Sequence, residues 1–387
     1  MRARLLASIH DVEPAAWDAC AGSDNPFVAH AFLAALEDSG CVDAGSGWQT
    51  RHLVIEDGAR GLVAAAPLYL KSHSFGEYVF DWAWADAYDR AGGQYYPKLQ
   101  LAVPFTPVPG PRLLVRQAGQ GQSGQGPSAL GPALAATLIE IARELDVSSL
   151  HATFLEPADA AILAQAGFLL RTGLQFHWTN RGYRSFEDFL AALASRKRKA
   201  IRKERRDVAD AGIIVRPLSG ASITEGHWDA FFRFYLATAS EKWGQPYLNR
   251  QFFRLLGERL GDRVVLMLAE KNGEPLAGAL NLRGRDTLYG RNWGAAADYP
   301  FLHFESCYYQ AIDYAIAHGL ARVEAGAQGP HKVQRGYLPV ETVSAHWIAD
   351  PGFRAAVADF VQREARQNAR QIASFTEHSP YRNRAAP

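Results

Sequence analysis

The feature that most restricts the fold is an internal duplication. The segment "ARELDVSSLHATF", which begins at Ala142, aligns without gaps with "AIAHGLARVEAGA", which begins at Ala315. Each segment reads as the end of an amphipathic helix, a turn and a buried strand. The alignment sets Leu150 against Val323, and the next position sets a histidine against a glutamate. Two copies of about 180 residues each indicate tandem homologous domains rather than a solenoid.

The elements that precede this matching pair also recur. Residues 25–40 predict a capped helix, and residues 51–71 predict two strands joined by a turn. Residues 245–261 and 264–284 repeat that order. We therefore predict an α/β fold with mixed sheets, built from two domains that meet near "HWTNRGYRSF" and span residues 1–178 and 179–387.

Composition excludes several classes of protein. A chain of 387 residues exceeds one ordinary core, and a net charge of +1 gives no overall attraction for polyanions. The three cysteines, Cys20, Cys41 and Cys307, have no paired spacing, so we expect neither a disulfide framework nor a metal site. The first apolar run stops at Ile9, and no run is long enough to span a membrane. These features predict a cytoplasmic protein.

Longer motifs resemble the FemAB-like branch of the GNAT acyltransferase superfamily. They are "VPFTPVPGPRLLV", "FLAALASRKRKAIRKERRDVADAGIIV" and "YYQAIDYAIAHGLARVEAGAQGPHKVQRGYLP". Further spellings, such as "HSFGEYVFDWAWADAY" and "LHFESCYYQAI", are similar to a proteobacterial subgroup of unassigned function. The resemblance covers nearly the whole chain. It implies tandem GNAT-like domains, the first binding the acceptor and the second binding the donor and carrying the chemistry.

This resemblance implies an acyltransferase that moves an aminoacyl group from aminoacyl-tRNA to an amine, such as a cell-wall precursor or a small molecule. Two alternatives stay open. One is an acyl-CoA-dependent N-acyltransferase, and the other is a non-catalytic domain pair that binds a cell-wall precursor or another anionic ligand. No tightly bound cofactor is expected, and the oligomeric state is left open.

The donor question depends on one short motif. Residues 116–121, "RQAGQG", match the pyrophosphate-binding pattern of acetyl-CoA enzymes, which places a phosphate at a helix N-terminus. However, the match lies in the Gly-, Gln- and Ser-rich stretch 117–131, which predicts a flexible loop remote from the next helix. The second copy has no such motif in "WGAAADYPFLHFES". Both observations favour aminoacyl-tRNA over acyl-CoA.

The segment from Val323 to Trp347 predicts the reaction site. In GNAT folds the strand ending in "RVEAG" borders the split between two central strands, so Glu324 would lie there and the following loop would cover it. Lys332 and Arg335 would neutralise an oxyanion or a phosphate. A structural loop of the Ω type is the alternative. The predicted catalytic residues are His303, Glu305, Glu324, His331, Lys332 and Arg335.

Two of these residues flank Phe304 at the start of a helix. In an extended segment His303 and Glu305 would point to the same side and form a general base and its orienting partner. Alternatively, Glu305 or Ser306 would cap the helix.

Residues for the acceptor come mainly from "SHSFGEYVFDWAWADAYDRAGGQYYPKLQ", which is rich in exposed-type aromatic and charged residues. Packing between domains is the alternative for this loop. The predicted substrate-binding residues are His73, Glu77, Asp86, Tyr95, Tyr96, Lys98, Arg291 and Tyr337. We expect Tyr96 and Lys98 to face the catalytic residues across a site between the two domains.

A basic segment, "SRKRKAIRKERRD", predicts a helix with two adjacent cationic faces. It reads either as a solvated surface or as a contact for tRNA phosphates. The predicted polyanion-binding residues are Arg198, Lys199, Arg202, Lys203, Arg205 and Arg206.

Overall fold

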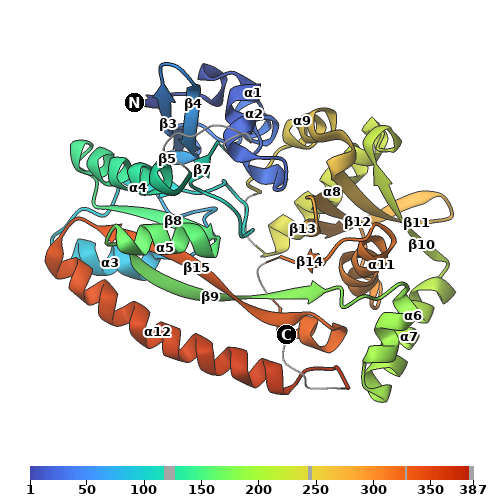
Figure 1. Ribbon diagram of the computed structural model, residues 1–387. Coiled ribbons are helices and arrows are strands. Elements are labelled where there is room, and N and C mark those ends of the chain that lie inside the picture. The colour runs from blue at the N-terminus through green and yellow to red at the C-terminus, as the bar shows by residue number, and fades with distance from the viewer. Residues whose placement is uncertain (117–126, 243–245, 327–328, 383–387) are drawn as a thin grey trace. The chain divides into compact units, whose positions relative to one another are not determined.

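The computed structural model describes residues 1–116, 127–242, 246–326 and 329–382, and it confirms an α/β fold with mixed sheets. The chain forms two compact units (Figure 1). Unit 1 combines Met1–Gly173 with Glu341–Ala369, and unit 2 combines Leu174–Val340 with the residues from Arg370 onward. The motif at 117–121 lies outside the described residues.

Unit 1 contains two sheets. In one, strands β1, β3, β4 and β7 pair in that order, and all its pairs are antiparallel. The other runs β2, β5, β6, β8 and β15, and its only parallel pair is β6 with β8 among the described strands. The elements are β1 (Arg2–Leu6), α1 (Pro14–Ala21), α2 (His30–Asp38), β2 (Trp48–Thr50), β3 (His52–Asp57), β4 (Gly61–Ala66), β5 (Leu68–Lys71), α3 (Trp82–Arg90), β6 (Lys98–Leu101), β7 (Leu114–Val115), α4 (Pro127–Glu144), β8 (Ser149–Leu155) and α5 (Pro157–Gln165).

Unit 2 contains one sheet in the order β10, β11, β12, β13, β14 and β9, with β13 and β14 parallel. Strand β11 carries the continuous apolar run "VVLMLA", which suits a strand buried on both faces. The elements are α6 (Phe186–Ala192), α7 (Ser195–Asp210), β10 (Ile213–Ser219), α8 (Glu225–Lys242), α9 (Arg250–Leu260), β11 (Val264–Lys271), β12 (Glu274–Arg283), β13 (Thr287–Ala295), α10 (Leu302–Phe304), the π-helix η5 (Glu305–Tyr309), α11 (Gln310–Ala317), β14 (Arg322–Glu324) and the 3-10 helix η6 (Pro330–Arg335).

Three elements run from one unit into the other: β9 (Leu169–Thr179), β15 (Leu338–Ile348) and α12 (Pro351–Glu377). Strand β9 follows β8 in the chain, but its last residues pair with β14 in unit 2. Strand β15 follows β14, but it pairs with β8 in unit 1. Each unit therefore receives its final strand from the other half of the sequence, and the predicted division at residue 178 did not include this exchange.

The duplication itself is confirmed by strand pairing. Strand β8 lies between a parallel neighbour, β6, and an antiparallel neighbour, β15. Strand β14 lies likewise between parallel β13 and antiparallel β9. Leu150 pairs with Trp347, and Val323 pairs with Trp178. The two aligned residues therefore occupy equivalent positions in equivalent strands, and each is buried in the core of its unit.

Two local expectations were wrong. Helix α4 begins at Pro127, inside the stretch expected to be a loop to residue 131, because the apolar residues Leu130, Leu134 and Leu138 recur at helical spacing and are buried. The segment around Phe304 is helical rather than extended, so His303 and Glu305 do not share a side. Among the helices that the structure describes, none is long and apolar enough to cross a membrane.

Candidate active site

The end of β14 forms an opening in the sheet of unit 2. Strands β13 and β14 pair through Thr287–Arg322, Leu288–Val323 and Tyr289–Glu324, after which β14 ends. Strand β13 continues to Ala295 and, among the described pairings, keeps only β12 as a neighbour. Glu324 therefore lies at the last paired position of these two strands.

Glu324 is a buried carboxyl group that is only partly satisfied. Its side chain is 6% exposed, and its Oε2 has no described hydrogen-bond partner. Burial raises the pKa of Glu324 to about 8, against a smaller opposing effect of Arg322. Its Oε1 lies 3.9 Å from Nδ1 of His177, whose own pKa burial lowers to about 3. The pair is thus mainly neutral at pH 7, and Glu324 can gain or lose a proton near that pH.

Lys332 is a second buried titratable group in unit 2. Its Nζ donates to the carbonyl oxygen of Gly326 at 3.0 Å, and the side chain is buried. Burial lowers the pKa of Lys332 to about 8. Its charge also contributes to the lowered pKa of His177, the neighbour of Glu324. Lys332 thus supplies a cation to the surroundings of His177.

Three other predicted residues meet in an aromatic group. The rings of His303 and His331 have centroids 6.1 Å apart, and Nε2 of His331 lies 2.9 Å from the hydroxyl of Tyr308. The guanidinium of Arg335 stacks 3.4 Å above the ring of Phe304 and donates to Glu204 at 2.9 Å. His303, His331 and Arg335 are therefore brought together, whereas the charge of Arg335 is already matched by a carboxylate.

Three other predicted residues of unit 2 are Glu305, Tyr337 and Arg291. Glu305 accepts two hydrogen bonds from Arg205, at 3.0 and 3.1 Å, so this acid holds η5 against α7. Tyr337 is completely buried in the core and donates to the carbonyl oxygen of Tyr308 at 3.1 Å, which removes it from substrate contact. Arg291 lies on β13 beyond the opening and is half-buried.

Half of the predicted polyanion-binding residues are paired with acids. Arg205 bridges Glu305 and Asp313, while Arg202 pairs with Glu187 and Lys203 with Asp207. The described contacts include no ion pair for the other three predicted residues, Arg198, Lys199 and Arg206, nor for Arg196 and Lys197 at the start of the same helix. A phosphate contact of this helix would depend on these five cations.

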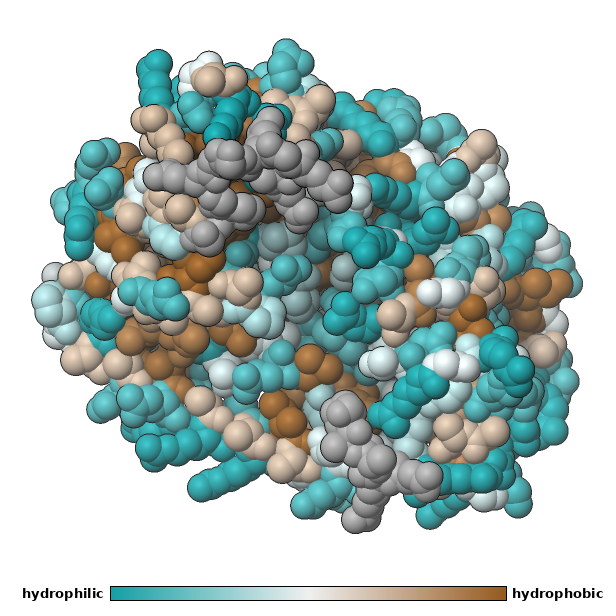
Figure 2. Space-filling view, in the orientation of Figure 1, coloured by the Kyte–Doolittle hydropathy of each residue, from teal (hydrophilic) through white to brown (hydrophobic). Residues whose placement is uncertain are grey.

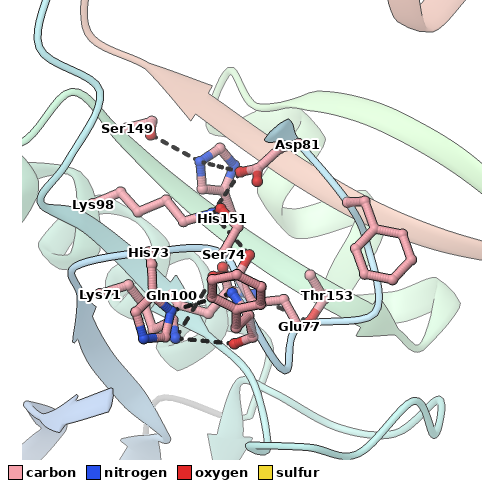
Figure 3. Close-up of polar contacts among 12 residues, drawn as sticks. Lys71, His73, Ser74, Glu77, Asp81, Lys98, Gln100, Ser149, His151 and Thr153 are labelled. Carbon is pink, nitrogen blue, oxygen red and sulfur yellow. Dashed lines mark hydrogen bonds and ion pairs between the residues drawn. The ribbon is translucent and has the colours of Figure 1, made fainter. Parts of the chain in front are cut away.

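Unit 1 contains a different polar centre, which we call the Lys98 cluster: Lys71, Ser74, Glu77, Asp81, Tyr95, Lys98 and Gln100. Figure 3 shows most of these side chains gathered around Lys98. The Lys98 Nζ donates to Glu77 Oε2 at 2.8 Å and Asp81 Oδ2 at 2.5 Å, and also to Ser74. Neighbouring charges raise the pKa of Lys98 despite complete burial. Lys98 is therefore a fixed cation that organises two buried carboxylates.

The predicted substrate-binding residues of unit 1 divide accordingly. Glu77, Tyr95 and Lys98 belong to the cluster, and Tyr96 joins it through a 2.8 Å hydrogen bond between its hydroxyl and Ser74. His73 lies at its margin, where its Nδ1 accepts from the backbone N–H of Phe75. Asp86 does not join, because it is exposed on α3 and pairs with Arg90.

A histidine pair extends this cluster and was not among the predicted residues. Nε2 of His151 lies 3.1 Å from the Tyr95 hydroxyl and 2.8 Å from Ser149, while its Nδ1 lies 2.7 Å from Nδ1 of His346. Burial lowers the pKa of His151 to about 3. The sequence does hold a signal for His346, since "HW" occurs both in β9, at His177, and in β15, at His346.

These histidines complete the duplication at the level of single residues. On β8, His151 is paired with Gln100 and His346. On β14, Glu324 is paired with Tyr289 and His177. Each row thus joins a titratable residue of the central strand to a histidine of the exchanged strand, with His151 and Glu324 as counterparts. Among the described residues, no group of His, Cys, Asp and Glu side chains is arranged to hold a metal ion.

Comparison with known proteins identifies the family. The sequence profile of the FemAB-like family, described as peptidoglycan biosynthesis/recognition, matches residues 8–383. The chain therefore belongs to the FemAB-like family. Membership in it supports an acyltransferase type of function. Among curated proteins, none matches this chain in sequence.

Solved structures share the fold at low sequence identity. FemX is 12% identical with a TM-score of 0.55, and the alignment covers 92% of this chain and 100% of FemX. The C-terminal domain of a putative lysylphosphatidylglycerol synthetase from Agrobacterium fabrum is 10% identical with a TM-score of 0.54, covering 89% of this chain and 94% of that domain. Both similarities establish a fold of the tandem GNAT type.

Proposed function

We propose that the protein transfers an acyl group to an amine, and that unit 2 carries the reaction at Glu324. The supporting observation is the position of this carboxyl group. It is buried beside the opening between β13 and β14, with one oxygen unpartnered and a pKa of about 8. A carboxyl group whose pKa lies near the working pH suits a general base.

The reaction follows from these groups. The amine nitrogen attacks the carbonyl carbon of the acyl donor and forms the new C–N bond. Glu324 takes the proton that the amine loses. The C–O bond of an ester donor then breaks, and the leaving oxygen receives that proton. The Lys332 ammonium offers positive charge for the oxyanion of the intermediate.

The favoured donor is aminoacyl-tRNA, and the favoured acceptor is a cell-wall precursor that carries an amine. The family description supports a role connected with peptidoglycan. The cations Arg198, Lys199 and Arg206 on α7 offer contacts for tRNA phosphates without base specificity. His303, His331 and Arg335 are proposed to border the donor site, since α10 and η6 bring them together. We further propose that Tyr96 and Lys98 serve the acceptor.

The test is a transfer assay with the full chain. A pool of tRNAs charged with radiolabelled amino acids, and acetyl-CoA in parallel, are incubated with a nucleotide-linked cell-wall peptide that has a free amine. We expect label on the peptide from the tRNA pool. Glu324→Gln lowers the rate by about a hundred-fold or more, within the range of general-base catalysis.

A matched control is Glu258→Gln, which makes the same change on the exposed surface of α9, where the glutamate pairs with Arg254. Its rate stays close to that of the wild type. Transfer by the Glu324→Gln protein at the wild-type rate contradicts the assignment of the base. Label from acetyl-CoA alone contradicts the tRNA donor and favours an N-acyltransferase.

A further inference from the structure

The segment of unit 1 from His73 to Trp82 combines buried acids with exposed aromatic rings. Glu77 and Asp81 are buried, whereas Phe75, Phe80 and Trp82 are 53%, 38% and 46% exposed. Large apolar side chains that gather at the surface commonly mark a binding site. The segment therefore has the features of a ligand site separate from Glu324.

The exposed rings are held in place from inside unit 1. The carbonyl oxygen of Phe75 accepts from both Lys71 and Trp48, each at 3.2 Å, and that of Phe80 accepts from Arg171 at 2.8 Å. The Phe80 and Trp82 rings are stacked with centroids 4.8 Å apart, and Phe75 lies 5.7 Å from Trp82. These contacts produce a fixed aromatic surface, which we call the Trp82 platform: His73, Phe75, Phe80 and Trp82.

Inside unit 1, the Lys98 cluster has more hydrogen-bond acceptors than it uses. Glu77 Oε1, Asp81 Oδ1 and Gln100 Oε1 are buried and have no described partner. The other oxygen of each carboxylate is bonded to Lys98, so the two unpartnered oxygens both lie close to its Nζ. Gln100 stands two residues after Lys98 on β6, on the same face of the strand. Three unfilled acceptors in one cluster indicate a missing donor.

The charges of the cluster select the type of donor. Lys71 Nζ lies 4.0 Å from Glu77 Oε1, too far for a hydrogen bond, and burial lowers the pKa of Lys71 to about 7. Burial also raises the pKa of Glu77 to about 7, so a bound cation is favoured in the state in which Lys71 is neutral and Glu77 is ionised, where the two carboxylates outnumber Lys98 by one charge. A cation with several N–H groups then satisfies both the charge and the open acceptors.

We propose that the Lys98 cluster and the Trp82 platform form a binding site for a primary ammonium group attached to an apolar or ring-bearing body. The ammonium group donates to Glu77, Asp81 and Gln100. The body of the ligand rests on the exposed rings. This inference rests on the proposed function, in which it names the residues that recognise the amine acceptor.

The test measures binding without any donor, using the full chain and benzylamine as the probe. Isothermal titration calorimetry compares benzylamine with benzyl alcohol, which has the same ring but no charge. We expect benzylamine to bind at least ten-fold more tightly. Glu77→Gln and Gln100→Met each weaken benzylamine binding by about ten-fold or more, because each removes an acceptor for a charged donor. Glu56→Gln, which makes the same change as Glu77→Gln at a half-exposed glutamate of β3 that pairs with Arg4, leaves binding unchanged.

Each other outcome has a definite meaning. Equal binding of benzylamine and benzyl alcohol, or no binding of either, overturns the ammonium site. Benzylamine binding that is unchanged in both the Glu77→Gln and the Gln100→Met variant also overturns the ammonium site. The thermal transition of each variant without ligand shows that it is folded, and the Gln100→Met variant keeps both buried ion pairs intact.

The Glu324→Gln variant distinguishes a failure of this inference from a failure of the proposed function. Glu324→Gln should bind benzylamine as the wild type does. If it binds but neither protein transfers an acyl group, the ammonium site stands and the proposed reaction fails. If transfer depends on Glu324 but benzylamine binding ignores Glu77 and Gln100, the reaction stands and the ammonium site fails.

Discussion

The two units place different chemistry at the same structural position. In unit 1 the central strand presents His151, which is neutral and fixed between Tyr95, Ser149 and His346. In unit 2 the counterpart is Glu324, which has an unpartnered oxygen and a pKa of about 8. A satisfied network rigidifies a structure, whereas an unsatisfied titratable group is available for reaction. Duplication thus preserved the row of residues, but of the two described rows only that of unit 2 has a carboxyl group on its central strand.

The largest expected effect concerns the exchanged strands. A chain that ends after residue 340 lacks most of β15 and the whole of α12. The missing residues Val357 and Val361 of α12 pack against Trp84 and Tyr95 in unit 1. We expect unit 1 in this fragment to lose its cooperative thermal transition, measured by calorimetry. A fragment of residues 1–178 should fail in the same way. Cooperative folding of residues 1–178 alone would contradict the exchange.

The next largest effect concerns Lys98, the buried cation of unit 1. Lys98→Met leaves Glu77 and Asp81 buried without their shared cation, which we expect to cost about 3–5 kcal/mol of the free energy of unfolding. Urea unfolding measures this change. The control, Lys203→Met, removes an exposed lysine of α7 and should change stability by less than about 1 kcal/mol. Equal effects of the two substitutions would remove the distinction between a structural lysine and a surface one.

Lys332 in unit 2 should behave in the opposite manner to Lys98. Lys332→Ala is expected to lower turnover by about ten-fold to a thousand-fold if its ammonium stabilises an oxyanion. The transfer assay and a thermal scan of the same sample check this prediction. Normal turnover combined with a lost thermal transition would show that η6 is a structural loop, which is the alternative left open by its sequence.

A smaller effect concerns the three predicted polyanion-binding residues of α7 that lack a described ion pair. Reversing Arg198, Lys199 and Arg206 to Glu should weaken tRNA binding by about ten-fold at low salt, and the loss should shrink as salt rises. Filter binding at several salt concentrations measures this. A triple reversal of exposed arginines on α12, Arg363, Arg366 and Arg370, serves as the control. Equal losses for both proteins would indicate a general charge effect.

The duplication and the hairpins could be predicted from the sequence because their signals are local. The match between the two helix–turn–strand segments predicted the equivalence of Leu150 and Val323, which strand pairing confirms. The hairpins β3–β4 and β11–β12 are also local and appear as predicted. Apolar spacing and turn residues determine such elements.

Contacts between residues far apart in the chain could not be predicted from local sequence patterns. The exchange of β9 and β15 depends on pairing between strands far apart in the chain, and the Glu305–Arg205 ion pair joins residues 100 positions apart. The helical conformation around Phe304 rests on such contacts as well, since Glu305 is drawn to α7. The repeated "HW" was a visible signal of the exchange, but its meaning required the strand register.

The most direct test of the central claim is the pH dependence of the transfer rate, measured in single-turnover reactions from pH 6 to pH 9.5. Burial raises the pKa of Glu324, so its basic form grows as pH rises. Lys332, whose pKa is also about 8, loses its ammonium charge over the same range, so we predict a bell-shaped wild-type profile with a maximum near pH 8. Glu324→Gln should have a much lower rate without the rising limb, and His151→Asn should keep that limb. A rising limb below pH 8 that persists in Glu324→Gln, or that disappears in His151→Asn, would contradict the assignment of the chemistry to unit 2.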